Sequence, residues 1–225
     1  MRRALAGVFN VNPPRPKYQD TWDVNVVLLH MQGLGPDVDL SDVQLTRKLA
    51  MLLALTTASR ASEIQGLNIE YMSDKGDQIA FTIPKLTKTR RPGMKPVTIA
   101  LRSYQDQASL DVVHCVRVYL RRTVEWRTSK DRHQLLLATV APHKPVVTST
   151  VSNWLKQLMG AAGIDTQKYQ GHSTRSASTS KARAAGLSVA EIVERANWSN
   201  ARTFNRFYNR VDSVQQAQFD KVVLG

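Results

Sequence analysis

The spacing of apolar side chains predicts helices over most of the chain. Behind Ser41, leucines recur at the three- and four-residue spacing of one buried helical face: Leu45, Leu49, Leu52 and Leu53. Ser41 and Gln44 also form the capping-box pattern that is typical of a helix start. We predict further helices over residues 22–34, 109–126 and 149–159, each from the same kind of periodicity.

The period of the pattern changes after Leu67. Residues 79–83 (IAFTI) and 97–101 (VTIAL) alternate apolar and polar positions, as half-buried strands do, and the very basic stretch TKTRRPGMKP lies between them. Short helices separated by Gly186 are predicted for the last third of the chain. The expected fold class is therefore mainly α with a small antiparallel β-sheet (α+β), in one domain.

Proline distinguishes the first segment from the rest. Residues 10–20 (NVNPPRPKYQD) contain three prolines and no apolar periodicity, which predicts an extended linker. The apolar stretch within the opening residues MRRALAGVFNVNPP is too short for a secretory signal. No apolar run is long enough to cross a bilayer, so we expect no membrane partner.

Charge adds the first functional indication. The 31 Lys and Arg residues against 18 Asp and Glu residues give a net charge of +13, which attracts polyanions. On charge alone, a merely basic soluble protein is an equally good interpretation. The single cysteine, Cys115, excludes an internal disulfide framework, fits a reducing compartment and lies in an apolar helical pattern that predicts a buried, inert thiol.

Most catalytic chemistries lack their residues here. The five histidines are scattered without the close Cys/His pairs of zinc sites, so no metal is expected. The glycine-rich nucleotide loops GxxxxGK[ST] and GxGxxG are absent, as is the hydrolase turn GxSxG. No cluster of paired acids suits glycoside chemistry. We expect no cofactor and no small-molecule substrate, which leaves phosphate chemistry without a metal.

Such chemistry needs several cations around one phosphate and a nucleophile from the protein itself. The sequence contains separated candidates for these roles: Arg60, Lys88, His172, Arg175, Trp198 and Tyr208. Each also has an ordinary structural explanation. Arg60 suits a helix end near a carboxylate, Lys88 a solvated turn, Trp198 a core position and Tyr208 a half-buried packing position.

Taken in order along the chain, these residues resemble the catalytic domain of the tyrosine recombinases, the phage-integrase superfamily. The family pattern is Arg-x-x-Glu-Ile/Leu, a lysine in a β-hairpin turn, His-x-x-Arg, then His or Trp, then a nucleophilic tyrosine. This chain has Arg60-Ala-Ser-Glu63-Ile64, Lys88 in TKT, HSTR at 172–175, and both aromatic residues downstream. The resemblance runs from about Ser41 to the C-terminus.

Further stretches resemble one branch of that family. NPPRPKYQDTWDV near the start and WSNARTFNRFYNR near the end look like the recombinases of eukaryotic Crypton and DIRS-like mobile elements. Trp198 stands where most prokaryotic members have a histidine. The resemblance implies a nuclear location for a eukaryotic mobile-element protein, and otherwise a cytoplasmic one at the nucleoid.

The resemblance also implies a division of the chain. Residues 1–20 would be a linker remnant from a missing N-terminal core-binding domain, and residues 21–210 the catalytic domain. Residues 211–225 would form a C-terminal tail, either exchanged between protomers or packed within its own protomer.

By the same resemblance, Tyr208 attacks a DNA phosphodiester and forms a 3′-phosphotyrosyl bond. His172 is the expected base, since its pKa lies near neutrality, and Lys88 the acid that protonates the leaving 5′-oxygen. Arg60 and Arg175 would hold the non-bridging oxygens. Trp198 would donate its indole N–H to the phosphate, and Glu63 would orient a cationic or histidine side chain, unless it is an ordinary surface acid.

The stretch GHSTRSASTSKARAAG, residues 171–186, would then face DNA. A helix that begins near His172 points its N–H groups toward the phosphate, and its small residues let the duplex approach. The predicted phosphate contacts lie on this helix and on the basic turn: Ser173, Thr174, Lys181, Arg183, Arg90, Arg91 and Lys95.

The implied partners are double-stranded DNA and further copies of the chain, as a tetramer on two duplexes. Strand exchange through phosphotyrosine needs neither ATP nor metal. Two alternatives remain open from the sequence: a domesticated DNA-binding domain without the reaction, and a type IB-like topoisomerase that relaxes DNA alone.

Overall fold

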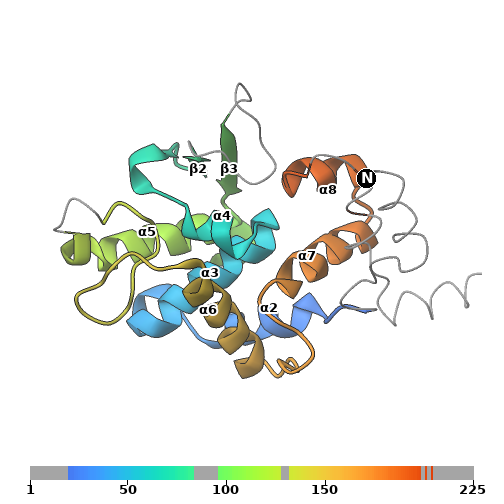
Figure 1. Cartoon of the computed structure of the whole chain (residues 1–225), viewed down its shortest axis with the longest axis horizontal. Coiled ribbons are helices and arrows are strands. Elements are labelled where there is room, and N and C mark those ends of the chain that lie inside the picture. Colours follow the sequence, from blue (N-terminus) through green and yellow to red (C-terminus); the bar gives the residue numbers. More distant parts are fainter. Residues whose placement is uncertain (1–19, 84–95, 128–131, 199–200, 202–203, 205–225) are drawn as a thin grey trace, which may run out of the picture.

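Helices form most of the molecule, and a small sheet lies along one side (Figure 1). The computed structural model describes residues 20–83, 96–127 and 132–198, together with Ala201 and Phe204. The predicted fold class, mainly α with a small antiparallel sheet, is confirmed for this part of the chain. No helix within it is long and apolar enough to span a membrane.

Helix α3 (Asp42–Thr57) lies at the centre of the helical layer. It contacts α5 (Val112–Arg122), α6 (Thr148–Ala161) and α7 (Ser173–Ala184), and most of its side chains are buried. The predicted capping box is present, because the Ser41 hydroxyl accepts from the Gln44 N–H and the Gln44 carboxamide accepts from the Ser41 N–H. The four predicted leucines are in the core.

The sheet contains three antiparallel strands in the order β1 (Met72–Asp74), β2 (Gln78–Ile83) and β3 (Val97–Arg102). The two predicted strands pair with Phe81 opposite Ile99, and their apolar positions are buried toward the helices. Strand β1 was not predicted. Its three mostly exposed residues carry no apolar alternation, so only pairing with β2 identifies it.

The helix predicted over 109–126 is divided in the structure. A 3₁₀ helix (Gln105–Leu110) precedes α5, and another (Val124–Arg127) follows it. The break occurs at Asp111, whose carboxylate accepts from the N–H groups of Val113 and His114 and so caps a new helix.

The remaining helices are short, and five of them, two being 3₁₀ helices, complete the described part of the chain. They are α2 (Val24–Gly33), the 3₁₀ helix Asp37–Asp39, α4 (Ala61–Gln65) with the 3₁₀ helix Ile69–Tyr71, and α8 (Val189–Arg195). Gly186 separates α7 from α8 with φ 95°, as predicted. The helices expected beyond residue 198 fall outside the described residues, apart from Ala201 and Phe204.

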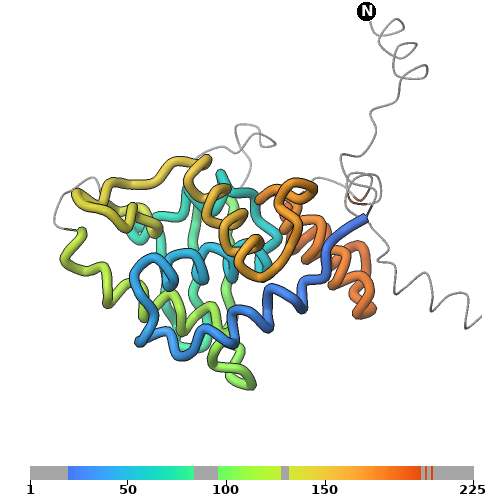
Figure 2. The backbone as a smooth tube through the Cα atoms, turned by 90° about the horizontal axis from the view of Figure 1, so that it is seen from below, coloured from blue at the N-terminus to red at the C-terminus, as the bar shows by residue number. Residues whose placement is uncertain are grey.

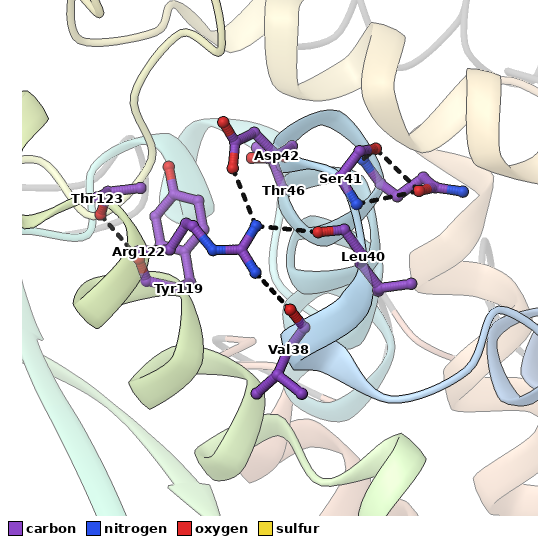
Figure 3. A network of polar contacts seen from close by, with 9 residues as sticks. Val38, Leu40, Ser41, Asp42, Thr46, Tyr119, Arg122 and Thr123 are labelled. Atoms are coloured by element: carbon purple, nitrogen blue, oxygen red, sulfur yellow. Dashed lines mark hydrogen bonds and ion pairs between the residues drawn. The ribbon is translucent and has the colours of Figure 1, made fainter.

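Arg122 fastens the end of α5 to the start of α3 (Figure 3). Its Nη1 donates to the Leu40 carbonyl at 3.0 Å and lies 3.2 Å from the Asp42 carboxylate, and its Nη2 donates to the Val38 carbonyl at 2.7 Å. One planar guanidinium thus serves three acceptors in the turn before α3. These hydrogen bonds from Arg122 fix the turn before α3, which also contains the buried carboxylate of Asp37.

Asp37 pairs with Lys48 of α3 at 2.8 Å, with both side chains almost fully enclosed. Cys115 lies beside the pair. Burial, together with the negative charge of Asp37, raises the pKa of the Cys115 thiol well above its ordinary value. The structure confirms the predicted burial of Cys115. Its lack of reactivity stays a prediction.

Replacing only one residue of the Asp37–Lys48 pair is expected to lower the free energy of unfolding more than replacing both. Lys48→Met should lower the free energy of unfolding by about 3–5 kcal/mol, because Asp37 stays buried without its counter-ion. The double variant Asp37→Leu/Lys48→Met should recover most of that loss. Urea unfolding followed by circular dichroism measures both, and a double variant as unstable as the single one would contradict this account.

Candidate functional site

Arg60 and Glu63 lie at the start of the short helix α4. Ala58 ends α3 in the left-handed region with φ 49°, which turns the chain so that Arg60 begins the next helix. The Glu63 carboxylate accepts from the Arg60 N–H at 2.6 Å and pairs with Arg60 Nη1 at 2.9 Å. The helix start therefore fixes both charges against each other.

Helix α7 brings Arg175 to the same carboxylate from 112 positions away. Its Nη1 lies 3.4 Å from Glu63 Oε2, and its Nη2 donates to the Ala196 carbonyl at 2.5 Å. Its guanidinium carbon lies 4.7 Å from the centre of the Trp198 ring, within cation–π range. Glu63 thus stands between two arginines, and α8 is joined to the second.

Trp198 belongs to a small apolar cluster beneath these charges. It packs with Phe204 at 5.6 Å between ring centres, and Ala58, Ile192 and Ala196 complete the cluster. The cluster is separate from the main core, so it links the end of α8 to the turn that presents Arg60.

The two arginines differ in access. The Arg60 side chain is 41% exposed, whereas that of Arg175 is only 3% exposed. An anion arriving from solvent can reach Arg60 directly. The Arg175 guanidinium already faces Glu63, Ala196 and Trp198, so an anion must compete for it.

His172 occupies the position just before α7 and is exposed. The residue before it, Gly171, lies so close to helix α6 that an added Cβ would sit 2.6 Å from the Ser152 carbonyl oxygen. The residue after it, Ser173, accepts a hydrogen bond from the Trp22 indole at 2.9 Å. The backbone is therefore held on both sides of His172.

The comparison with known proteins identifies the family. The model of the phage integrase family matches residues 37–214, which is most of the chain. The chain belongs to this family. The predicted membership in the phage-integrase, or tyrosine recombinase, family is therefore confirmed. A search of curated protein sequences finds no match.

Solved structures of site-specific recombinases have the same fold. A XerH recombinase bound to a palindromic difH substrate matches with TM-score 0.67 and 12% identity, over 92% of this chain and 54% of that one. XerA recombinase matches with TM-score 0.65 and 15% identity, over 95% and 67%. The Tn1549 transposon integrase in complex with transposon right-end DNA matches with TM-score 0.56 and 12% identity, over 95% and 68%. The chain spans about half the length of the XerH protein.

Five of the predicted site residues lie outside the described part of the chain. They are Lys88 and Tyr208 of the family pattern, and the predicted DNA contacts Arg90, Arg91 and Lys95. The structure thus brings together Arg60, Glu63, Arg175 and Trp198, and sets His172 at the start of the helix that contains Arg175. The catalytic roles of all these residues remain predictions.

Two of the four predicted DNA contacts on α7 are buried in the structure. Ser173 and Thr174 are each only 2% exposed, and the Thr174 hydroxyl donates to the Gly171 carbonyl at 2.8 Å. Small side chains on α7 let α2, α3 and α8 approach it closely, and its contacts with DNA stay a prediction. The other two predicted contacts on α7, Lys181 and Arg183, are exposed. Lys181 donates to the Asn25 side chain, and Arg183 donates to the Leu187 carbonyl at 3.0 Å.

A cleft of about 640 Å³ adjoins the site and was not predicted. It lies between the C-terminal end of α3, α4, strand β3, α7 and α8, and Glu63, Thr179 and Asn197 are among the residues that line it. Arg195 ties its walls together by donating to the carbonyls of Thr56 and Ala100 at 2.9 and 2.8 Å. No local sequence signal indicates such a cleft, because its walls come from five separate elements. Among the described residues, no three His, Cys, Asp or Glu side chains gather as metal ligands.

Glu63 is expected to matter more for stability than Arg60. Glu63→Ala leaves the enclosed Arg175 without its counter-ion, which should cost about 3–5 kcal/mol in the free energy of unfolding. Arg60→Ala should cost about 1 kcal/mol or less, because its side chain is largely solvated and its backbone contact with Glu63 remains. Urea unfolding of both variants tests this, and equal losses would contradict the asymmetry.

Proposed function

We propose that the chain is the catalytic domain of a site-specific DNA recombinase that cuts and rejoins DNA through a 3′-phosphotyrosyl intermediate. The observation that carries this proposal is the arrangement of Arg60 and Arg175 around Glu63, in a chain of the phage integrase family. Two guanidiniums fixed near each other can bind the two non-bridging oxygens of one phosphate.

In the proposed reaction, the Tyr208 hydroxyl oxygen attacks the phosphorus in line and the bond to the 5′-oxygen breaks. The phenol proton goes to His172, since a tyrosine with its ordinary pKa of about 10 is a poor nucleophile at neutral pH. Lys88 protonates the leaving 5′-oxygen. A 5′-hydroxyl then attacks the phosphotyrosine and restores a phosphodiester, so no bond energy needs to be supplied from ATP.

The cations stabilise the charge that builds on the phosphorus oxygens. Arg60, with its exposed guanidinium, suits the first contact with an arriving phosphate. Arg175, already oriented by Glu63 and Trp198, needs little reorganisation once an oxygen replaces one of its present acceptors. These are the roles that the pattern of residues predicts.

Double-stranded DNA is the proposed partner. The net charge of +13 supports it, and the XerH and Tn1549 proteins of similar fold were solved with DNA. Self-association on DNA is proposed from the lambda integrase tetramer bound to a Holliday junction, which has the same fold with TM-score 0.55. The closeness to Crypton and DIRS-like elements stays a proposal that rests on the sequence stretches alone.

Covalent trapping tests the proposal. The chain is incubated in EDTA with a library of nicked duplexes that have a randomised core, and protein–DNA adducts that survive detergent are isolated and sequenced. We expect adducts with the native chain, because the free nick lets the cleaved end leave and traps the enzyme.

Two variants decide how the adduct arises. Tyr208→Phe should abolish it, and Arg60→Ala should slow its formation by about 10²–10³-fold, the usual effect of removing one preorganised charge donor. An adduct that persists in Tyr208→Phe would overturn the proposed nucleophile. Native chain that binds the duplexes without any adduct would favour a DNA-binding domain that lacks the reaction.

A further inference from the structure

The segment that leads into α2 is fastened along helix α7. Asp20 accepts hydrogen bonds from Lys168 Nζ at 2.7 Å and from the Tyr169 hydroxyl at 2.9 Å, just before the helix. Trp22 Nε1 donates to the Ser173 hydroxyl at 2.9 Å, at the first residue of the helix. We call residues 20–25 the N-terminal strap. Its path beside α7 can be followed in Figure 2.

The strap continues to the far end of α7, where Asn25 accepts from Lys181 Nζ. Its start is held by charge as well as geometry, since the hydrogen bond from Lys168 is the main cause that lowers the pKa of Asp20. Asp20 is therefore ionised at neutral pH. The strap is thus fixed at both ends of the helix, with Trp22 between them.

Trp22 makes its contact one residue from His172. Both Trp22 and Ser173 are buried, so losing either partner would leave a polar group unsatisfied, which usually costs more than the bond itself contributes. His172 is exposed, and the backbone that bears its ring runs directly into Ser173. On the N-terminal side of His172, the close approach of Gly171 to Ser152 of α6 holds the same backbone.

We propose that Trp22 is a positioning residue: through Ser173 it fixes the backbone at His172, and so the direction in which the imidazole faces the proposed reacting groups. This inference rests on the proposed function for its effect on catalysis. The Trp22 indole N–H donates to the Ser173 hydroxyl oxygen and so ties the first residue of α7 to the strap. The turn is then held by the strap at Ser173 and by α6 at Gly171.

The test compares Trp22→Phe, which keeps an aromatic ring but loses the N–H, with Trp126→Phe as a matched control. Trp126 lies in the 3₁₀ helix that follows α5 and stacks on His143. We expect Trp22→Phe to slow adduct formation on a trapped duplex by about 10-fold with unchanged DNA affinity, the size of effect that a small misplacement produces. Trp126→Phe should leave both unchanged.

A double-mutant cycle separates positioning from general damage. In a His172→Ala background, Trp22→Phe should have no further effect on the rate, because the group through which Trp22 acts is gone. An undiminished 10-fold effect in that background would overturn the proposal, as would a native rate in Trp22→Phe alone.

A second measurement does not depend on DNA. The imidazole resonances of His172, assigned by comparison with His172→Gln, should shift in Trp22→Phe and not in Trp126→Phe. Unmoved resonances would overturn the positioning role even for a chain that forms no adduct. Absence of an adduct from the native chain, with the resonances shifted, would count against the proposed function alone.

Discussion

The site depends on one carboxylate that two arginines share. Glu63 is buried, and an ionised carboxylate taken out of water is tolerated only when charged partners and hydrogen bonds surround it. Arg60 supplies both a backbone N–H and a guanidinium, and Arg175 supplies the second guanidinium. Without the carboxylate, the two cations would repel each other, so α4 and α7 could not meet in this way. The position of α8 follows, since Arg175 also holds the Ala196 carbonyl.

Helix α7 can be buried although it has almost no apolar side chains. Two of its hydroxyl groups donate to nearby backbone carbonyls: Thr179 to that of Arg175 at 2.7 Å, and Thr174 to that of Gly171 at 2.8 Å. Short side chains that satisfy their own polar groups can pack as closely as alanine does. This allows three other helices, α2, α3 and α8, to pack against the helix that carries Arg175.

The sequence predicted what local patterns encode. The capping box at Ser41, the buried face of α3 and the alternation in β2 and β3 each follow from residues near one another in the chain. The order of Arg60, Glu63 and Arg175 indicated a common site, because a family pattern connects residues that no periodicity relates. The burial of Ser173 could not be predicted, since a hydroxyl-rich helix has the same composition whether it faces DNA or other helices. The contact between Trp22 and Ser173 spans 151 positions and leaves no local signal.

The difference in access between the two arginines would connect anion binding to the turn at the end of α8. A phosphate oxygen that accepts from Arg175 Nη2 competes with the Ala196 carbonyl, which lies at the end of α8. Two residues later, Trp198 packs against Arg175 and against Phe204. Any exchange of acceptors at Arg175 therefore acts on the turn from Ala196 to Trp198. A phosphate held only by the exposed Arg60 would leave that turn as it is, so only an anion that engages both arginines would couple its binding to the end of α8.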